Sequence, residues 1–372
     1  MSILIRKEIP ELKTLVIKIG SRILTVDGHA RRMNRLSEDI ATLHTSGVRI
    51  IIVSSGAIAH GMEALQCEKR PASIPLQQAC ASIGQHRLMH RYEHFFSRRH
   101  IPIGQVLITW DDLRSKKRYL NLRNTLFQLL DRRCIPVVNE NDSVGVEEIQ
   151  FGNNDMLGAQ VALLAHADLF VNLTDVGGLF SGNPHTDSDV KHIPVVTAMS
   201  SVVRKMASDT KREISVGGMA TKLKAVEMVT RAGIFGLIGD GFTHRLSEVL
   251  TTSTIATLFL PDAKKMSSRH RWIAFTGQST GELFIDDGAE TALLKRGKSL
   301  LPAGVRTVTG TFRHGDTVAI KTLAGTLIAR GLVNYSSDEM QLIKSCKSTE
   351  ISTKLGVKRF DEVVHRDNLV VL

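Results

Sequence analysis

The chain has 372 residues, of which 42% are hydrophobic and 23% are charged, so we expect a folded protein rather than a disordered or fibrous one. This length favours two domains. No apolar run is long enough to cross a bilayer, and the first residues lack the layout of a signal peptide. We therefore expect a cytoplasmic protein that does not associate with membranes.

The cysteine and histidine content argues against a metal site. No pair of the four cysteines has the C-x-x-C spacing of zinc or redox motifs. Three of the 14 histidines are spaced four apart, which fits an exposed helix face better than a zinc site. We predict free cysteines and no metal held by the protein itself. The four cysteines are Cys67, Cys80, Cys134 and Cys346, and the three evenly spaced histidines are His86, His90 and His94.

The net charge of +11 leaves three kinds of partner open: nucleic acid, an anionic small-molecule substrate, or only the solvent around basic surfaces. From Gly281 to the end the net charge is +2, so the remaining +9 belongs to residues 1–280. Much of it lies in the interval Arg87–Arg133, whose Lys and Arg runs we interpret as exposed helix faces.

Apolar runs alternate with helical patterns through the first 260 residues. Several runs consist of continuous Ile, Val and Leu, as expected for strands buried on both faces of a parallel sheet. The pattern predicts an α/β fold, a three-layer αβα sandwich with a mainly parallel sheet. The predicted strands are Thr14–Ile19, Arg49–Val53, Ile103–Ile108, Ile135–Val138, Leu169–Leu173 and Phe235–Ile238. The predicted helices are Asn34–Thr45, Leu76–Arg99, Arg114–Arg132, Asp155–Ala165 and Thr221–Arg231.

The pattern changes after Pro261. Residues 262–280 are basic and polar, and we predict that they form a linker between a first domain, residues 1–261, and a second domain, residues 281–372. The second domain contains several short segments that are separated by turn signals. This pattern predicts a small domain that is rich in β-strands. These segments are Gly281–Gly288, Val305–Phe312, Val318–Thr322 and Leu327–Val333.

Small polar clusters follow three of the predicted strands. They are Ser54–Ala57, Asn139–Asp142 and the pair Thr174 and Asp175. In open α/β sheets, ligands bind at the carboxyl ends of the strands. The three clusters together therefore predict a binding site at that edge of the sheet.

Two lysines lie in settings that suit a phosphate. Lys18 ends a strand and precedes Gly20 and Ser21, where backbone N–H groups can approach an anion closely. Lys222 closes the segment Val216–Lys222, whose two glycines open a predicted helix and expose N–H donors. Two converging cations would serve phosphoryl transfer, because negative charge builds up on the transferred group. Neither segment is a Walker A loop, and each alone is also typical of an ordinary turn.

The segments Asn139–Asp142 and Gly152–Asp155 are dense in amides and carboxylates. Such side chains can bind an amino acid, with carboxylates for its ammonium group and amides for its carboxylate. They are equally suited to Asx turns and helix N-caps. Asp155 in particular lies where it would cap a helix that begins at Met156.

Six segments follow one another along the chain: Lys18–Ser21, Val53–Ile58, Asn139–Asp142, Gly152–Asp155, Leu173–Asp175 and Gly217–Lys222. In this order they resemble the glutamate 5-kinases of the amino acid kinase superfamily. The second domain resembles a PUA domain, which bacterial members often carry, and Gly297–Val305 is its most typical stretch. The resemblance extends from Thr14 to Arg366.

This resemblance implies an enzyme that uses ATP to phosphorylate the γ-carboxylate of L-glutamate, giving γ-glutamyl phosphate, in the first step of proline biosynthesis. Mg²⁺ would bridge the phosphates, mostly through ATP oxygens and water. The acceptor carboxylate is already ionised at neutral pH, so no general base is needed. Catalysis would then depend on positioning and charge neutralisation.

The resemblance also assigns roles residue by residue. Lys18 and Lys222 would bind the ATP phosphates and stabilise the transferred group, and Asp155 would hold both ammonium groups in place. The positions that match glutamate-binding residues are Ser55, Asp142 and Asn154. Besides the two lysines, the positions that match nucleotide-binding residues are Thr174, Asp175, Val216, Gly217, Gly218, Met219, Ala220 and Thr221.

The chain departs from the family pattern at four positions. Arg22 replaces a small hydroxyl residue, Asn153 and Asn183 replace acidic residues, and Val216 replaces a threonine. Both lysines and Asp155 are retained, so we still expect activity. The resemblance further implies feedback inhibition by proline, glutamate-5-semialdehyde dehydrogenase as the downstream enzyme, and a homodimer or homotetramer.

Two alternatives remain open. The first is another kinase of the superfamily, acting on acetylglutamate, carbamate or uridylate, although Asn139–Asp142 and the PUA-like domain favour glutamate. The second is an RNA-binding protein, since PUA domains elsewhere bind RNA. The charge of this domain is only +2, and it lacks a series of aromatic residues for base stacking, so we favour a structural or regulatory role for it.

Overall fold

The computed structural model describes residues 6–9, 11–145, 154–182, 190–208, 218–262, 266–276 and 279–372. The chain divides into two compact units, one formed by Met1–Leu113 with Lys117–Lys265 and the other by Arg114–Lys116 with Met266–Leu372. Within the described ranges, no helix is long and apolar enough to cross a membrane. All four cysteines are free, as predicted.

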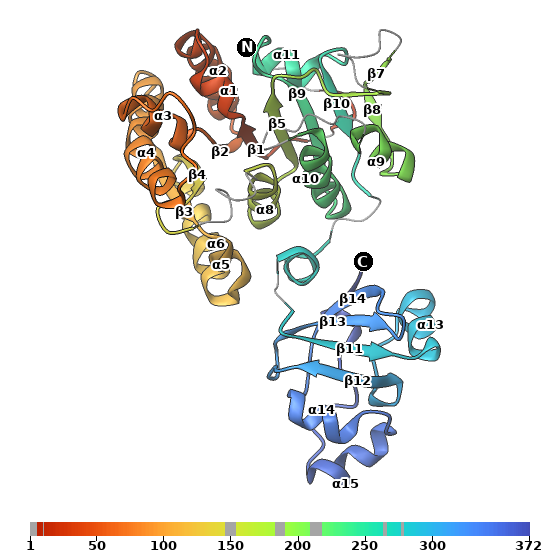
Figure 1. Cartoon of the computed structure of the whole chain (residues 1–372). Coiled ribbons are helices and arrows are strands. Elements are labelled where there is room, and N and C mark those ends of the chain that lie inside the picture. Colours follow the sequence, from red (N-terminus) through yellow and green to blue (C-terminus); the bar gives the residue numbers. More distant parts are fainter. Residues whose placement is uncertain are drawn as a thin grey trace. The chain divides into compact units, whose positions relative to one another are not determined.

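The first unit is built on an eight-stranded sheet with the order β3-β4-β2-β1-β5-β9-β10-β8 (Figure 1). The strands from β3 to β9 in this order are parallel, whereas β10 is antiparallel to β9. The mainly parallel α/β sheet is therefore confirmed. The strands are β1 (Thr14–Ile19), β2 (Arg49–Ser54), β3 (Ile103–Ile108), β4 (Ile135–Glu140), β5 (Leu169–Thr174), β8 (Val195–Val196), β9 (Phe235–Asp240) and β10 (Ala256–Phe259).

All six predicted strands are present, and four of them extend by one or two residues beyond the predicted end, three of these into the polar cluster that follows. β4, for example, includes Asn139 and Glu140, which are both buried. The patterns did not predict β8, β10 or the small sheet of β6 (Leu179–Phe180) and β7 (His192–Ile193). Runs of two to four residues carry too little periodicity to be recognised.

Helices cover both faces of the sheet. On β1, side chains alternate, so that Leu15, Ile17 and Ile19 join the core beneath α2, α4 and α11, while Lys18 lies against α8 on the opposite face. The helices of this unit are α1 (Ser21–Thr25), α2 (His29–Thr45), α3 (Ala57–Ala64), α4 (Ile74–Ser97), α5 (Trp110–Arg114), α6 (Lys116–Asp131), α8 (Asn154–Ala165), α9 (Ser201–Ser208), α10 (Met219–Arg231) and α11 (Leu246–Thr251).

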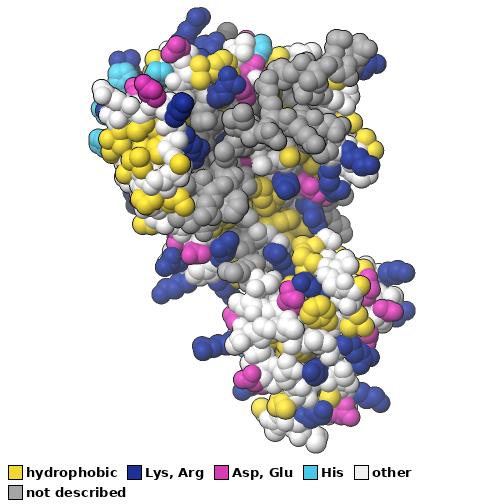
Figure 2. Space-filling view, in the orientation of Figure 1, with side chains coloured by type: hydrophobic (Ala, Val, Ile, Leu, Met, Phe, Trp, Pro, Cys, Tyr) yellow, Lys and Arg dark blue, Asp and Glu magenta, His cyan; other side chains and the backbone are white. Residues whose placement is uncertain are grey.

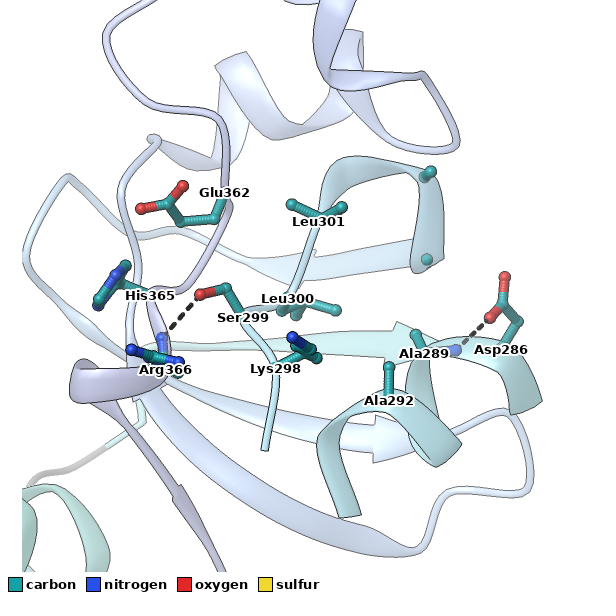
Figure 3. A pocket seen from close by; sticks show the side chains of 12 residues that line it. Asp286, Ala289, Ala292, Lys298, Ser299, Leu300, Leu301, Glu362, His365 and Arg366 are labelled. Atoms are coloured by element: carbon teal, nitrogen blue, oxygen red, sulfur yellow. Dashed lines mark hydrogen bonds between the residues drawn. The ribbon is translucent and has the colours of Figure 1, made fainter. Parts of the chain in front are cut away.

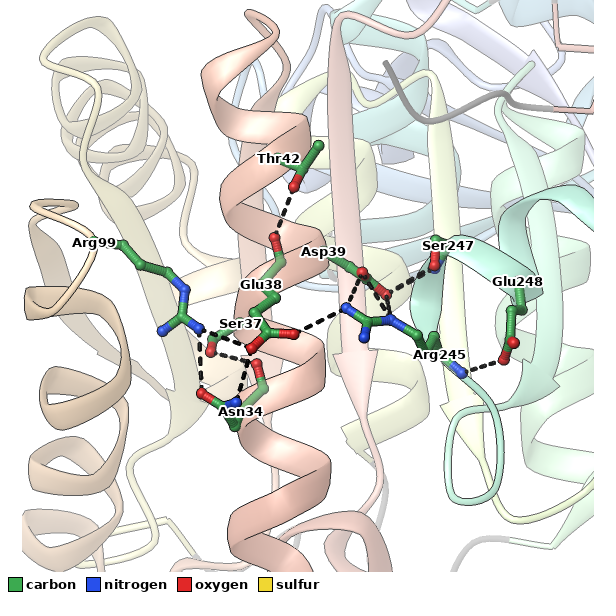
Figure 4. A network of polar contacts seen from close by, with 9 residues as sticks. All are labelled: Asn34, Ser37, Glu38, Asp39, Thr42, Arg99, Arg245, Ser247 and Glu248. Atoms are coloured by element: carbon green, nitrogen blue, oxygen red, sulfur yellow. Dashed lines mark hydrogen bonds and ion pairs between the residues drawn. The ribbon is translucent and has the colours of Figure 1, made fainter. Parts of the chain in front are cut away.

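Polar contacts tie α2 to its neighbours (Figure 4). Arg245, which precedes α11, donates two hydrogen bonds to Asp39 Oδ1, from Nε at 3.2 Å and from Nη2 at 2.7 Å. Its Nη2 also lies 3.0 Å from Glu38 Oε2. Arg99, beyond the end of α4, donates to Asn34 Oδ1 at 3.2 Å. Asp39 is buried, so its pair with Arg245 is partly shielded from water, and the hydrogen bond raises the pKa of Arg245. These contacts fix the connection between β9 and α11.

The second unit contains a five-stranded sheet with the order β12-β11-β13-β14-β15 around a core of its own. This confirms the predicted β-rich C-terminal part. The predicted linker, residues 262–280, contains α12 (Ser268–Arg271) and a π-helical turn (Trp272–Thr276). Ile273 and Ala274 of this turn are buried against Leu332 and Val370. The predicted domain boundaries stay a prediction. The elements are β11 (Gly281–Ile285), α13 (Asp287–Arg296), β12 (Val305–Gly310), β13 (Thr317–Thr322), β14 (Leu327–Leu332), α14 (Ser337–Ile343), α15 (Ile351–Leu355) and β15 (Leu369–Val371).

Candidate active site

The polar clusters at the strand ends meet at one edge of the first sheet. β2, β1 and β5 are parallel neighbours, so Ile19 lies beside Ser54 on one side and beside Leu173 on the other. Val53 of β2 in turn pairs with Val138 of β4. The residues that follow these positions therefore emerge next to one another, as the sequence predicts.

Three buried charged side chains meet at this edge. Lys18 Nζ lies 2.7 Å from Asp155 Oδ1, and Lys222 Nζ lies 3.3 Å from Asp155 Oδ2. The side chains of Lys18, Lys222 and Asp155 are 8%, 9% and 3% exposed. The structure thus brings together the two lysines and the aspartate that the sequence singled out. Asp155 lies inside the first turn of α8, which begins at Asn154, and is not the cap of a helix that starts at Met156.

Two further contacts complete the surroundings of the Asp155 carboxylate. Asn172 Nδ2 donates to Oδ1 at 3.0 Å, and the Thr221 hydroxyl lies 2.9 Å from Oδ2. Burial alone would raise the pKa of Asp155, but Lys18 and Lys222 outweigh it and hold the pKa below its ordinary range. The carboxylate is therefore ionised at neutral pH and holds both ammonium groups in fixed positions.

The cluster carries more positive than negative charge. Burial lowers the pKa of Lys222, and Asp155 opposes that effect. Two ammonium groups share one carboxylate in a place that excludes most water, where electrostatic interactions are stronger than in solution. This arrangement suits an anion that bears several charges.

A glycine allows the close approach on which this cluster depends. α8 packs across β1 and β5, and a Cβ added to Gly158 would come within 2.8 Å of the Phe170 ring and 3.2 Å of Lys18 Cβ. A larger residue there would push α8 away from the sheet and separate Asp155 from Lys18. Lys222 reaches the same carboxylate from the first turn of α10, which lies beside α8 (Figure 1).

Asn154 joins two strand ends next to this cluster. Its Nδ2 lies 2.9 Å from Ser55 Oγ, 3.2 Å from the Ser54 carbonyl oxygen and 3.4 Å from Asn139 Oδ1. Ser54 ends β2 and Asn139 belongs to β4. Two of the predicted glutamate-binding residues, Ser55 and Asn154, are therefore in direct contact.

Asp142, the third predicted glutamate-binding residue, follows β4 and is 5% exposed. Its Oδ1 has no hydrogen-bond partner among the residues that the structure describes. Burial raises the pKa of Asp142 to about 6, while Arg70 acts in the opposite direction. A buried carboxylate is costly without a partner, so a cationic group of a ligand would be bound favourably here.

Thr174 ends β5 and Asp175 follows it, on the other side of β1 from Ser55. Thr174 Oγ1 lies 3.1 Å from Asp175 Oδ1, and Asp175 forms an ion pair with Arg22 of α1. Burial would raise the pKa of Asp175, but a backbone hydrogen bond and Arg22 lower it. The side chain of Arg22 is 65% exposed, and its guanidinium carbon lies 5.8 Å from the centre of the Phe242 ring. The arginine that departs from the family pattern thus contacts a predicted nucleotide residue.

The other predicted nucleotide-binding residues belong to the beginning of α10 or lie outside the described residues. Gly218 is the N-cap of α10, and Met219, Ala220 and Thr221 form its first turn. The structure does not describe Val216, Gly217, Asn153 and Asn183.

Two polar residues at this edge were not predicted. Asn172 is fully buried beside Asp155, and its position within the apolar run of β5 is a signal that could have revealed it. Gln85 lies in α4 and accepts a hydrogen bond of 2.8 Å from Asn139 Nδ2. No sequence pattern separates Gln85 from the other polar residues of its helix.

Comparison with known proteins agrees with this site and fold. The model of the amino acid kinase family matches residues 13–240, and that of the PUA domain matches residues 281–355. The chain is 44% identical to the glutamate 5-kinase of Geobacter sulfurreducens over 97% of this chain and 98% of that protein. The chain is 42% identical to the glutamate 5-kinase of Trichlorobacter lovleyi over 97% of each chain. It is 41% identical to the glutamate 5-kinase of Carboxydothermus hydrogenoformans over 99% of this chain and 100% of that protein. The chain therefore belongs to the amino acid kinase family and, within it, to the glutamate 5-kinases.

Proposed function

We propose that this chain transfers a phosphoryl group from ATP to the γ-carboxylate of L-glutamate, giving γ-glutamyl phosphate in the first step of proline biosynthesis. The observation that carries the proposal is the buried contact of Lys18 and Lys222 with one carboxylate, Asp155. Relatives that are 44% and 42% identical over nearly the whole chain are named for this activity.

The reaction needs neutralisation of charge more than it needs proton transfer. In phosphoryl transfer, negative charge spreads over the oxygens of the moving group, and Lys18 and Lys222 would stabilise it. Asp155 holds both lysines before the substrates bind, so little reorganisation would be needed during the reaction. The acceptor carboxylate is already ionised, so we assign no general base.

Ser55, Asp142 and Asn154 are the residues that we propose bind L-glutamate. The buried Oδ1 of Asp142, which has no partner among the described residues, suits the ammonium group. Ser55 and Asn154 contact each other at the end of β2, beside the strand that carries Lys18, and offer hydroxyl and amide groups to a carboxylate.

We propose that ATP binds between Lys18, the pair Thr174 and Asp175, and the segment Val216–Lys222. The described residues include no group of three or more His, Cys, Asp or Glu side chains that could hold a metal ion. Mg²⁺ would therefore be held mostly by ATP oxygens and water, and it would neutralise part of the phosphate charge.

Membership of the glutamate 5-kinases supports four further proposals. Proline would act as a feedback inhibitor, and glutamate-5-semialdehyde dehydrogenase would consume the acyl phosphate. The enzyme would work in the cytoplasm as a homodimer or homotetramer. Size-exclusion chromatography with light scattering, and initial rates at increasing proline concentration, would test the oligomer and the inhibition.

A second candidate function, RNA binding by the PUA domain, has one observation in its favour. A cavity of about 680 Å³ in the second unit is lined by Lys298, His365 and Arg366, although Asp286 and Glu362 also line it (Figure 3). Figure 2 shows Lys and Arg side chains scattered among acidic and neutral ones on the face in view, without one dominant basic patch. Filter binding of single-stranded RNA at increasing salt tests this candidate, because affinity for phosphates falls steeply with salt.

The kinase proposal is tested by trapping the acyl phosphate with hydroxylamine. Formation of γ-glutamyl hydroxamate should require both ATP and L-glutamate. Acetylglutamate, carbamate and UMP serve as competing acceptors, with release of ADP as the readout. Turnover of acetylglutamate without turnover of glutamate would refute the proposed function.

A further inference from the structure

Gln85 is a buried glutamine whose amide nitrogen lacks a partner in the part of the chain that the structure describes. The residue is 9% exposed, and its Oε1 accepts a hydrogen bond of 2.8 Å from Asn139 Nδ2. Its Nε2 has no hydrogen-bond partner among the residues that the structure describes. Buried side-chain donors are nearly always paired with protein, water or ligand, so this nitrogen needs an explanation.

The contacts of Asn139 determine which end of the Gln85 amide is unpaired. Asn139 Oδ1 accepts a hydrogen bond of 2.9 Å from the backbone N–H of Glu140, and Asn154 Nδ2 lies 3.4 Å from the same oxygen. The nitrogen of Asn139 therefore faces Gln85, and only the oxygen of Gln85 can accept from it. The two N–H donors of Gln85 Nε2 are left without an acceptor among the described side chains and backbone groups.

Hydrogen bonds connect Gln85 to the proposed glutamate-binding residues. Gln85 contacts Asn139, Asn139 contacts Asn154, and Asn154 contacts Ser55. Asp142, which follows Asn139 after two residues, has a buried oxygen that also lacks a partner among the described residues. Within the described ranges, this neighbourhood therefore offers an unpaired acceptor with negative charge and unpaired N–H donors. These are the complements of an ammonium group and a carboxylate.

Gln85 is carried by a rigid part of the fold. A Cβ added to Gly84 would come within 1.7 Å of the Ala57 carbonyl oxygen, and one added to Gly61 within 1.8 Å of the Cys80 carbonyl oxygen. The backbones of α3 and α4 are therefore packed directly against each other. Because α3 begins just beyond Ser55, this packing holds Gln85 at a fixed position relative to the end of β2.

We propose that Gln85 Nε2 donates a hydrogen bond to the α-carboxylate of the acceptor amino acid, while Asp142 binds its ammonium group. This inference rests on the proposed function. The γ-carboxylate must face Lys18 and Lys222 to receive the phosphoryl group, so the α-carboxylate is the group that remains for Gln85. Gln85 then selects acceptors that carry a second carboxylate.

Two substitutions in the full-length protein separate this role from a structural one. Gln85→Glu keeps an oxygen for Asn139 but places a negative charge where we propose the α-carboxylate binds. Gln85→Met removes the donor, and the acceptor for Asn139, without adding a charge. Gln128→Glu makes the same chemical change on the exposed surface of α6 and serves as the control.

The KM for L-glutamate should rise about 10- to 100-fold in Gln85→Met, as expected for a lost hydrogen bond to a charged group, and further in Gln85→Glu. The kcat and the KM for ATP should stay near those of the wild type and of Gln128→Glu. The melting temperature should fall in both variants, because Gln85→Met leaves Asn139 Nδ2 without its acceptor and Gln85→Glu buries a charge, so the test depends on the KM for L-glutamate and not on stability. The inhibition constant of 4-aminobutyrate, which lacks the α-carboxylate, should change less than about threefold in Gln85→Met.

An unchanged KM for L-glutamate in Gln85→Glu would overturn the inference, as would an equal loss of affinity for L-glutamate and 4-aminobutyrate. The dissociation constant for L-glutamate is measured by calorimetry in parallel. If the wild type binds L-glutamate without forming hydroxamate, the proposed function fails. The role of Gln85 is then still tested by the dissociation constants of the wild type and the Gln85 variants. If the wild type forms hydroxamate and Gln85→Glu binds L-glutamate normally, only this inference fails.

Discussion

The two ends of the candidate site differ in how their buried carboxylates are paired. At the phosphate end, the Asp155 carboxylate contacts Lys18, Lys222, Asn172 and Thr221. At the acceptor end, an oxygen of Asp142 and a nitrogen of Gln85 have no partner among the described residues. The first end is assembled by the protein alone, whereas we infer that the second is completed by its ligand.

The two carboxylates show the same difference in their pKa values. Burial acts to raise both, but the pKa of Asp155 is held low by Lys18 and Lys222, whereas that of Asp142 rises to about 6. Buried charges are stable when they are paired, and otherwise they favour the neutral form. The comparison shows that burial can have opposite consequences for two carboxylates, depending on the cations within reach.

The largest effect is expected from removing a lysine at the phosphate end. Lys222→Ala and Lys18→Ala should each lower kcat roughly 100- to 1,000-fold, as loss of one transition-state contact does in other enzymes. Lys224→Ala is the matched control, because Lys224 lies on the same helix and is exposed. Hydroxamate formation is the measurement, and near-normal rates for either site variant would refute the assigned role.

Replacement of Asp155 should reduce both activity and stability. Asp155→Asn leaves two buried ammonium groups without their carboxylate, which typically costs about 3–5 kcal/mol of unfolding free energy. Because folding lowers the pKa of Asp155, its contribution is present in full above its ordinary pKa and is lost as the pH falls through the lower folded value. Denaturant unfolding should therefore show a constant deficit above about pH 5 that narrows in stronger acid. A deficit that does not change with pH would contradict the assigned ionisation.

Replacement of Asp142 should weaken acceptor binding but stabilise the free protein. Folding raises the pKa of Asp142 from 3.8 to about 6, so the wild type loses stability as the pH rises through this interval. At pH 7, Asp142→Asn should unfold with a free energy higher by up to about 3 kcal/mol, and the difference should vanish near pH 3. The KM for L-glutamate should rise about 10- to 100-fold. The control is Asp131→Asn on the exposed surface of α6, and a destabilised Asp142→Asn would contradict this account.

The smallest effect is expected from Arg22, whose ion pair with Asp175 is largely exposed. Exposed pairs contribute about 0–1 kcal/mol, so Arg22→Ser should change the KM for ATP less than about fivefold and hardly alter unfolding. Initial rates over a range of ATP concentrations provide the measurement. A change above tenfold would show that Arg22 binds the nucleotide and belongs to the phosphate end.

Much of the framework was predictable from local patterns. Apolar runs such as Thr14–Ile19 predicted strands, and the polar residues after them predicted the edge where the site lies. The shortest strands and helices were missed because they carry too little periodicity. Gln85 was missed because its role depends on a hydrogen bond to Asn139, more than fifty residues away in the chain.

The sequence by itself determined the mainly parallel sheet and the β-rich second unit, and it predicted Lys18, Lys222 and, through the family resemblance, Asp155 as the charged residues of the candidate site. Local residue order can do this, because strand and helix periodicity and glycine turns are properties of short segments. Only the tertiary structure decided which charges are paired. Pairing depends on how closely α8 and α10 approach the sheet, and this distance is set by contacts such as that of Gly158 with Phe170.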